Sequence, residues 1–522
     1  MVMRSYDSTR KLFYGIGAGL TLCLNWSLVA AAQDVAAPVT TQTAAEPSSE
    51  GGSLPQPAGS PARADEADFT WLLELINDAG YFKVPQLTLR KDSNYAFSAT
   101  DMEPFRHVTP YKEHFLEQME YTGPGRGIPE PEHIASVKIG FIGPIVPTVS
   151  VATGGRSHEE SLGVAMLRGA QMAIRQANER GGYLRRHIPF ELQLANDNGL
   201  WGSTGDEVIK MAYTEKPEDQ VWAILGSIDS ANTHIAIRVA LKAEIVMLNT
   251  ADTDPTFIET NIPWVMRCIS DDRQMNYLLV DYLYRKLDYR RVGIIRASNR
   301  YGRFGVREIR DGARRLNRPV ILEMAYKLGI TDFSMQLERL ETANLDAVVH
   351  WGDAVDGAAI LNQMRARGMS QPYFACDRCV SDEFVALAGA NAEGVVCAYP
   401  WDPTRQDPAL EAFRTAFREG NGTDPDTYAA HAYDGMNMLI EAIQVAGLNR
   451  AKIRDVLAHR SSPYKGVTGF IPLSACLDDL GEVLLARFEG GQWRYHSRQD
   501  WEIPGGIIAP RDRASRKVAA EQ

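Results

Sequence analysis

The sequence predicts an α/β protein whose parallel sheets are divided between two lobes. Continuous apolar runs of strand length, of which Val137 to Gly143 (VKIGFIG) is the first, alternate with helical stretches over most of the 522 residues. Such alternation is typical of a parallel sheet covered by helices on both faces. About ten strands of this kind follow one another, which is too many for one domain of ~150 residues. Two lobes are therefore expected.

The first helical stretch carries apolar residues three or four positions apart, which places them on one face of a helix. These residues are Leu162, Met166, Ala170, Ala173, Ile174 and Ala177. Gly181 and Gly182 follow, and glycines are common where helices end. We expect this face to pack on the sheet.

The segment before Val137 has a different character. Basic residues precede an apolar stretch from Leu12 to Ala30 and a run of alanines, which together are the pattern of a secretory signal peptide over residues 1–32. An uncleaved membrane anchor is the alternative, because the apolar stretch approaches spanning length. Residues 33–66 are poor in large apolar side chains and predict a flexible linker. Residues 67–136 form an irregular extension of undefined fold.

Composition and motifs exclude several classes of function. The net charge of −11 and the pI near 5.5 argue against a nucleic-acid partner, which requires a basic surface. The sequence has no GxSxG elbow, HExxH motif, Walker loop or GxGxxG loop after a strand. Acidic residues at strand ends offer acid–base pairs, but no spacing indicates a nucleophile beside a base. We expect neither an enzyme nor a bound cofactor.

Cysteines give two further expectations. Five remain after the signal peptide: Cys268, Cys376, Cys379, Cys397 and Cys476. In an oxidising compartment some of them should pair, and an odd number leaves at least one free. The CDRC pair (Cys376 and Cys379) has redox or metal spacing, but it lacks a second CxxC and a nearby His-x-His cluster. The sequence therefore does not predict a metal site.

Polar segments follow the predicted strands. Ligands of open parallel sheets bind beyond the carboxyl ends of the strands. The segments at those ends are GSIDSAN (226–232), NTADTDP (249–255), ASNRYGRFG (297–305), HWGDA (350–354) and ACDRC (375–379). We expect a ligand to lie among them.

From about Val137 to about Arg498, the order of these segments resembles the type I periplasmic binding proteins, most closely the leucine/isoleucine/valine-binding family that feeds ABC transporters. The matching stretches are KIGFIGP, LRGAQMAIRQANERGG, AILGSIDSANT, VMLNTADTDPTF, VMRCISDDRQMNYLLVDYL, NRYGRFG, GITDFSMQLERL, NQMRARGM and AYDGMNMLIEAI. The resemblance implies two Rossmann-like lobes joined by three hinge crossings. These fall near Met266–Ser270, near Tyr399–Pro403 and in the strand after Gly466–Gly469. The implied division is 137–268 and 402–465 for lobe 1, 269–401 and 466–498 for lobe 2, and 499–522 for a C-terminal tail.

The resemblance also implies a function. The protein is expected to act as a monomeric receptor in the periplasm that captures a small polar ligand, an amino acid or a related amide or carboxylate, between its lobes. It would deliver the ligand to an inner-membrane ABC transporter permease. The alternative is a sensor or assembly component that uses the same clamp to dock to a periplasmic partner, since residues 33–136 form an unusually long leader.

The family's ligand contacts map onto this sequence residue by residue. The expected binding residues are Ser230, Ala251, Asp252, Thr253, Tyr301, Trp351, Asp353 and Asp377. The resemblance implies that the Ser230 hydroxyl, with groups of Ala251 to Thr253, receives an α-carboxylate. It implies that Tyr301 closes from the other lobe and that Asp377 takes the α-ammonium. Trp351 is expected from its place at a strand end, where it either forms a stacking wall for the ligand or packs at the interface of the lobes. Charge-assisted hydrogen bonds in a closed cleft are strong.

Asp252 departs from the family pattern, which has a small apolar residue there. Two like charges about 4 Å apart repel by ~4 kcal/mol at an effective dielectric of ~20. Either Asp252 turns away to cap the segment Asp254-Pro255-Thr256, or the ligand is cationic, polyhydroxylated or bound through a cation. The sequence leaves these alternatives open.

Overall fold

The computed structural model describes residues 120–145, 158–197, 201–260, 262–474 and 476–501. The predicted signal peptide, the linker, most of the extension and most of the C-terminal tail lie outside these ranges. Within them, no helix combines the length and apolarity needed to span a membrane.

The first sheet has five parallel strands in the order β2-β1-β3-β4-β5. They are β1 (Val137–Gly143), β2 (Phe190–Asn196), β3 (Val221–Leu225), β4 (Val246–Asn249) and β5 (Val265–Arg267). Strand order reverses between β1 and β3, and ligands of such sheets bind at this switch point. The ends of β3 and β4 are therefore where the sheet presents polar residues to a ligand.

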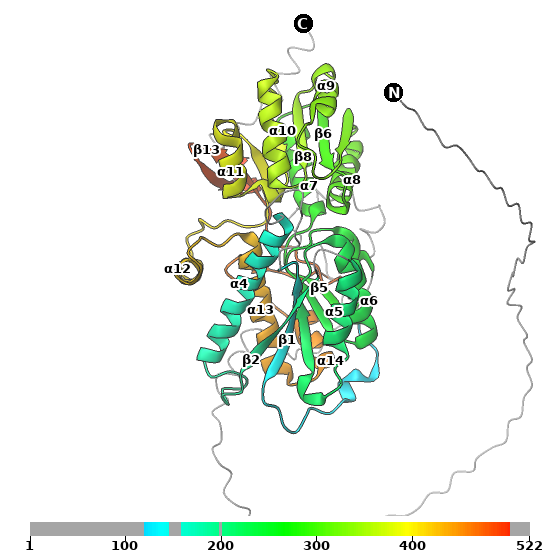
Figure 1. The fold of residues 1–522 in the computed structure, drawn as a ribbon, viewed down its shortest axis with the longest axis vertical. Helices are drawn as coiled ribbons and strands as arrows, with labels where there is room; N and C mark the ends of the chain where they lie inside the picture. The colour runs from blue at the N-terminus through cyan, green and yellow to red at the C-terminus, as the bar shows by residue number, and fades with distance from the viewer. Residues whose placement is uncertain (1–119, 146–157, 198–200, 261, 475, 502–522) are drawn as a thin grey trace, which may run out of the picture. The chain divides into compact units, whose positions relative to one another are not determined.

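Among the described residues, this lobe has the helices α4 (His158–Glu179), α5 (Trp201–Ala212), α6 (Ser230–Ala243), α12 (Pro408–Asn421), α13 (Thr427–Ala446) and α14 (Arg450–Ala458). The apolar face predicted for α4 is buried, as expected, from Leu162 to Ala177. Helix α13 runs beside α4, although more than 200 residues separate them in the chain (Figure 1). Gly169 permits this approach, because a Cβ atom there would lie 2.1 Å from the carbonyl oxygen of Ala429.

The second sheet has seven strands in the order β14-β13-β10-β9-β8-β6-β7. They are β6 (Val292–Ala297), β7 (Leu322–Tyr326), β8 (Ala347–Trp351), β9 (Tyr373–Ala375), β10 (Val396–Tyr399), β13 (Leu484–Glu489) and β14 (Gln492–His496). Strands β6 to β10 are parallel and repeat the order of the first sheet, with a switch point between β6 and β8. The antiparallel hairpin of β13 and β14 extends the sheet beside β10.

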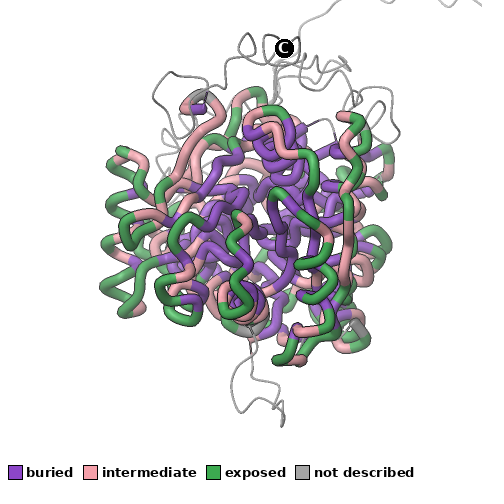
Figure 2. The backbone as a smooth tube through the Cα atoms, turned by 90° about the horizontal axis from the view of Figure 1, so that it is seen from above, coloured by how far each residue is buried: buried purple, intermediate pink, exposed green. Residues whose placement is uncertain are grey.

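The helices of this lobe are α7 (Asp272–Val280), α8 (Arg300–Arg315), α9 (Ser334–Thr342), α10 (Ala354–Ala366) and α11 (Asp382–Ala388). Shorter helical segments are also present. The 3-10 helices are η3 (Pro124–Gly127), η4 (Pro217–Asp219), η5 (Pro255–Thr260), η7 (Asp377–Cys379), η8 (Gly389–Ala392) and η9 (Arg498–Trp501), and η6 (Asp281–Lys286) is a π-helix. Buried residues gather in the interior of the described chain, and exposed residues lie toward its periphery (Figure 2).

Three chain segments connect the sheets. The first follows β5 and the second follows β10. The third runs from the end of a small hairpin, β11 (Tyr464–Lys465) and β12 (Phe470–Ile471), to β13. The strand after Gly469 is thus part of this hairpin, and the passage into the second sheet comes after it. Arg267, the last residue of β5, links the first connecting segment to the third, because its guanidinium donates two hydrogen bonds of 2.7 Å to the Asp478 carboxylate.

The expectation that some cysteines pair is wrong for this structure. All five cysteines of the described chain are free and buried. Their sulfur atoms belong to different parts of the fold, and a disulfide needs two Cα atoms within about 7 Å. In the CDRC pair, two of these sulfur atoms lie close together, within 4.8 Å of each other.

Candidate functional site

The end of β3 leads into helix α6 through a polar turn. Asp229 caps the helix and accepts hydrogen bonds from the backbone N–H groups of Ala231 (2.8 Å) and Asn232 (3.2 Å). Ser230 follows at the first helical position and is buried. Its hydroxyl donates to Oδ1 of Asp252 at 3.0 Å. The hydroxyl that the family resemblance assigns to a ligand carboxylate is therefore occupied by a carboxylate of the protein itself.

The end of β4 is satisfied internally in the same way. The side-chain oxygen of Asn249 accepts from the N–H groups of Ala251 (3.0 Å) and Asp252 (2.7 Å). Oδ1 of Asp252 also accepts from the N–H of Asp254 at 3.0 Å. Asp252 therefore caps the turn, as the first of the two alternatives predicts, and it also accepts a hydrogen bond from Ser230. Its other oxygen, Oδ2, has no hydrogen-bond partner.

Burial controls the charge of Asp252. The side chain is 2% exposed. Burial, and next the carboxylate of Asp254, raise the pKa of Asp252 to about 7, because both disfavour the charged form. Near neutral pH this group is therefore poised between a hydrogen-bond donor and an anion.

In the other lobe, Asp377 is held by two tyrosines. The Tyr301 hydroxyl donates to Oδ1 of Asp377 at 2.6 Å, and the Tyr428 hydroxyl donates to Oδ2 at 2.8 Å. Tyr301 begins α8 in the same lobe, whereas Tyr428 comes from the first turn of α13 in the first lobe. Burial, and next the Asp377 carboxylate, raise the pKa of both phenols far above the usual range, so both remain donors.

Trp351 and Asp353 flank this group at the end of β8. Trp351 is fully buried, its ring centre lies 6.0 Å from that of Tyr301, and its indole nitrogen has no hydrogen-bond partner. Asp353 forms an ion pair of 2.7 Å with Arg378, whose guanidinium lies 3.9 Å from the centre of the Tyr301 ring. The structure therefore brings Trp351, Asp353, Tyr301 and Asp377 together.

Asp272 was not predicted and belongs to the same region. It opens α7, its N–H donates to the carbonyl of Thr253 at 2.8 Å, and both of its carboxylate oxygens are buried without a hydrogen-bond partner. Burial, and next the charge of Asp377, raise the pKa of Asp272 well above its usual value, and the Thr253 side chain opposes this shift. Its position directly after a hinge segment was visible in the sequence, but its approach to Asp377 was not.

Three buried carboxylates of this region have no ion-pair partner within the described chain, although the charge of Arg267 opposes the rise in the pKa of Asp252. Asp252, Asp272 and Asp377 form no ion pair within the described chain, whereas Asp254 pairs with Arg300 and Asp478 with Arg267. A buried carboxylate without a compensating cation is costly. The arrangement is suited to a guest that brings positive charge or several hydrogen-bond donors.

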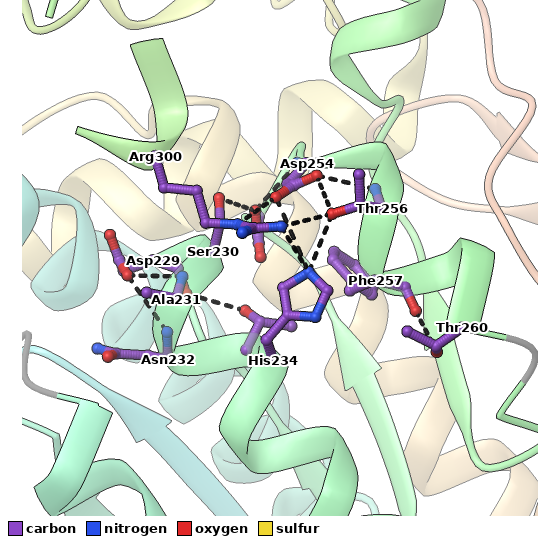
Figure 3. A network of polar contacts seen from close by, with 12 residues as sticks. Asp229, Ser230, Ala231, Asn232, His234, Asp254, Thr256, Phe257, Thr260 and Arg300 are labelled. Atoms are coloured by element: carbon purple, nitrogen blue, oxygen red, sulfur yellow. Dashed lines mark hydrogen bonds and ion pairs between the residues drawn. The ribbon is translucent and has the colours of Figure 1, made fainter. Parts of the chain in front are cut away.

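A polar network beside the site joins the two lobes (Figure 3). Arg300, at the start of α8, donates to Oδ2 of Asp254 (2.7 Å), to the hydroxyl of Thr256 (2.7 Å) and to Nε2 of His234 (2.9 Å). The Thr256 hydroxyl in turn donates to Oδ1 of Asp254 at 2.6 Å. Burial, and next the charge of Arg300, lower the pKa of His234, which keeps the imidazole neutral as an acceptor. We call these four residues the latch.

A cavity of about 750 Å³ opens beside the hinge and not among the predicted ligand contacts. Its lining includes Ser270, Trp401, Arg405, Asp479 and Glu482, from all three connecting segments and their surroundings. None of the eight predicted binding residues lines it. In this structure two pairs of the predicted contacts bond to each other, Ser230 to Asp252 and Tyr301 to Asp377.

Comparison with known proteins agrees with the architecture. The profile of the periplasmic binding protein family matches residues 136–477, more than half of the chain. The chain therefore belongs to the periplasmic binding proteins, a family of solute-binding receptors.

Individual relatives have low sequence identity, but the match extends over most of their length. The chain is 25% identical over 340 residues to Leu/Ile/Val-binding protein homolog 2 of Brucella abortus, which covers 64% of this chain and 87% of the relative. It is 27% identical over 344 residues to an amino acid binding protein of Pseudomonas aeruginosa, with 64% and 85% covered.

Solved structures share the fold at lower identity. The branched-chain amino acid transporter substrate binding protein LivJ of Streptococcus pneumoniae, in complex with isoleucine, superposes with a TM-score of 0.61 at 21% identity, covering 69% of this chain and 99% of that one. A solute binding protein from R. palustris in complex with benzoate gives 0.60 at 15% identity, covering 69% and 96%.

Proposed function

We propose that the protein is exported through its N-terminal signal peptide and acts as a monomeric receptor, delivering a small polar ligand to an inner-membrane ABC transporter permease. The ligand is an amino acid or a related amide or amine, held between the strand ends of the two lobes. The binding residues are the predicted set of eight, together with Asp272 and Tyr428. The protein binds this ligand without changing it chemically.

The observation that carries this proposal is the pair of facing strand ends. Ser230, Ala251, Asp252 and Thr253 lie at the ends of β3 and β4, and Asp377 with its two tyrosines lies opposite. Asp377 accepts hydrogen bonds from both lobes, through Tyr301 and Tyr428. A ligand that bonds to Asp377 would thus contact both lobes, which is how hinge closure reports binding to a partner.

The charges favour an ammonium group over a carboxylate as the main recognition element. Asp377 and Asp272 offer buried oxygens to a cation. The carboxylate receptors expected in lobe 1 are already used: Ser230 donates to Asp252, and the N–H groups of Ala251 and Asp252 donate to Asn249. The similar solved structures hold isoleucine or benzoate. We do not expect this chain to bind such a carboxylate in the same way unless Asp252 is replaced or protonated.

A thermal-shift screen tests the proposal most directly. The purified protein is heated with amino acids, amino-acid amides, polyamines and short carboxylates, because a ligand that binds only the folded state stabilises it by about 2.7 kcal/mol at 100 times its Kd. We expect a rise in Tm with at least one class, lost in Asp377→Asn and retained in the exposed-surface control Asp424→Asn. If no compound in any class raises Tm, receptor function at this site is refuted.

The alternative function is docking to a periplasmic partner. The cavity beside the hinge favours it, because a group bound there would contact all three connecting segments and so sense the hinge. A pull-down with the full chain and with a chain lacking residues 33–136 separates the two functions. A partner lost with that segment supports an assembly component, and ligand-dependent capture of a permease supports the receptor.

A further inference from the structure

Behind the predicted ligand contacts, the fold brings an imidazole to the CDRC pair. Nδ1 of His350 and the sulfur atoms of Cys376 and Cys379 all lie within 4.8 Å of one another, and the three side chains are fully buried. His350 is next to last in β8, and the two cysteines bracket the turn η7 that follows β9. The sequence alone gave no histidine near this pair, because the partner comes from the neighbouring strand.

Neighbouring residues orient the imidazole of His350 and leave space beside its Nδ1 and the Cys379 sulfur. The Tyr326 hydroxyl lies 3.0 Å from Nε2 of His350, which leaves Nδ1 directed at the sulfur of Cys379, 3.7 Å away. Gly357 faces the same point: a Cβ atom there would lie 2.8 Å from Nδ1 of His350 and 3.0 Å from the Cys379 sulfur. Any larger side chain at position 357 would fill the space between the two ligand atoms.

We propose that Nδ1 of His350 and the sulfur atoms of Cys376 and Cys379 bind one thiophilic metal ion, zinc(II) or copper(I). Tetrahedral zinc–sulfur and zinc–nitrogen bonds of about 2.3 and 2.0 Å place two such ligands about 3.5 Å apart, close to the observed 3.7 Å. Thiolate and imidazole are the ligands that these two ions prefer. The Tyr326 hydroxyl supplies the outer hydrogen bond that metal-binding histidines commonly make.

Binding exchanges protons for the metal. Two thiol protons leave for solvent, and the ion takes their place; one of them is the proton that Cys376 now donates to the carbonyl of Gly352 at 2.9 Å. Zinc(II) with two thiolates and a neutral imidazole has no net charge, which suits a buried site, whereas copper(I) leaves one negative charge. Burial lowers the pKa of His350 to about 3, so the imidazole is already in its binding form.

Metal analysis of the purified, reduced protein tests this proposal. The protein is incubated with zinc(II), cobalt(II) or copper(I) in separate arms, dialysed and analysed for bound metal, and the cobalt arm is examined for a thiolate-to-cobalt charge-transfer band. We expect one ion per chain in the wild type and in Cys268→Ser, which removes a buried thiol at the hinge. The variants Cys379→Ser and His350→Gln should bind the metal at least tenfold more weakly. Incubation of the wild type with zinc(II) and copper(I) together then identifies the preferred ion as the one that stays bound.

Two milder variants keep the test valid if those side chains are needed for folding. Tyr326→Phe removes only the outer hydrogen bond and should weaken metal binding about tenfold. Gly357→Ala should weaken it by obstructing the site while all three ligands remain. The proposal is overturned if the reduced wild type retains no ion, if the ligand variants retain as much as the wild type, or if Cys376 and Cys379 form a disulfide whose reduction yields no metal binding.

Discussion

Replacement of Asp252 by asparagine tests which charge the ligand must carry. The amide oxygen still accepts from the Ser230 hydroxyl and the Asp254 N–H, both now at 3.0 Å from Oδ1, but the side chain no longer ionises. A ligand carboxylate at Ser230 requires Asp252 to be protonated. A ligand cation requires it to be ionised. The pH dependence of affinity therefore has opposite signs for the two kinds of ligand.

The magnitude follows from the pKa of about 7. At pH 7 about half of the Asp252 side chains are protonated, so selecting the protonated form for ligand binding costs only about 0.4 kcal/mol. Each further pH unit raises this cost by up to about 1.4 kcal/mol, which lowers the affinity up to about tenfold. Leucine should therefore bind the wild type progressively more weakly from pH 7 to pH 8.5. For 3-methylbutylamine, which is leucine without its carboxylate, affinity should rise up to about pH 7 and then level off.

Isothermal titration calorimetry from pH 6 to 8.5 measures both profiles. Asp252→Asn should bind leucine more tightly than the wild type at pH 8.5, bind the amine more weakly, and lose the pH slope in each case. Asp424→Asn, which removes an exposed carboxylate, serves as the control and should behave as the wild type. If the variant binds leucine no better at pH 8.5, or if the wild-type profile for leucine is flat, the charge argument at Asp252 is refuted.

Three further substitutions address the other parts of the site. Asp377→Asn should weaken binding of 3-methylbutylamine by about 2–5 kcal/mol in calorimetry, because it removes one partner of a buried charge pair; unchanged affinity would exclude Asp377 as a ligand contact. Arg300→Gln breaks the latch and should enlarge the radius of gyration in X-ray scattering. The wild type should open in the same way as pH falls below about 6.5, since protonated His234 repels Arg300, and scattering that is constant in both cases contradicts this. Arg267→Met should lower the free energy of unfolding in urea by about 3–5 kcal/mol, whereas Arg285→Met, at an exposed pair, should change it by less than about 1 kcal/mol.

Much of the architecture could be predicted because its signals are local. The spacing of apolar residues from Leu162 to Ala177 defines the buried face of α4, and each buried strand is a short apolar run. The segments after β3, β4, β6, β8 and β9 were located because parallel strands end at one edge of their sheet.

Contacts between distant segments could not be predicted in this way. Tyr428 reaches Asp377 because α13 returns to the first lobe beside α4, and its sequence contains no sign of that partner. The imidazole of His350 reaches Cys379 because β8 and β9 are neighbours in the sheet. Likewise, the sequence identified Asp252 as unusual but did not fix its rotamer, which decides both of its hydrogen bonds.

On the proposed function, the buried carboxylates make closure depend on the charge of the ligand. In an open form, water would solvate Asp252, Asp272 and Asp377, and closure removes them from water, which costs several kcal/mol for each ionised group. The latch between Arg300 and Asp254 is a paired contact and offsets little of this cost. A bound cation offsets it directly, whereas a neutral or anionic ligand does not. Closure would then report a cationic ligand in particular, because a positive charge compensates the buried carboxylates and a neutral or negative ligand leaves their cost in place.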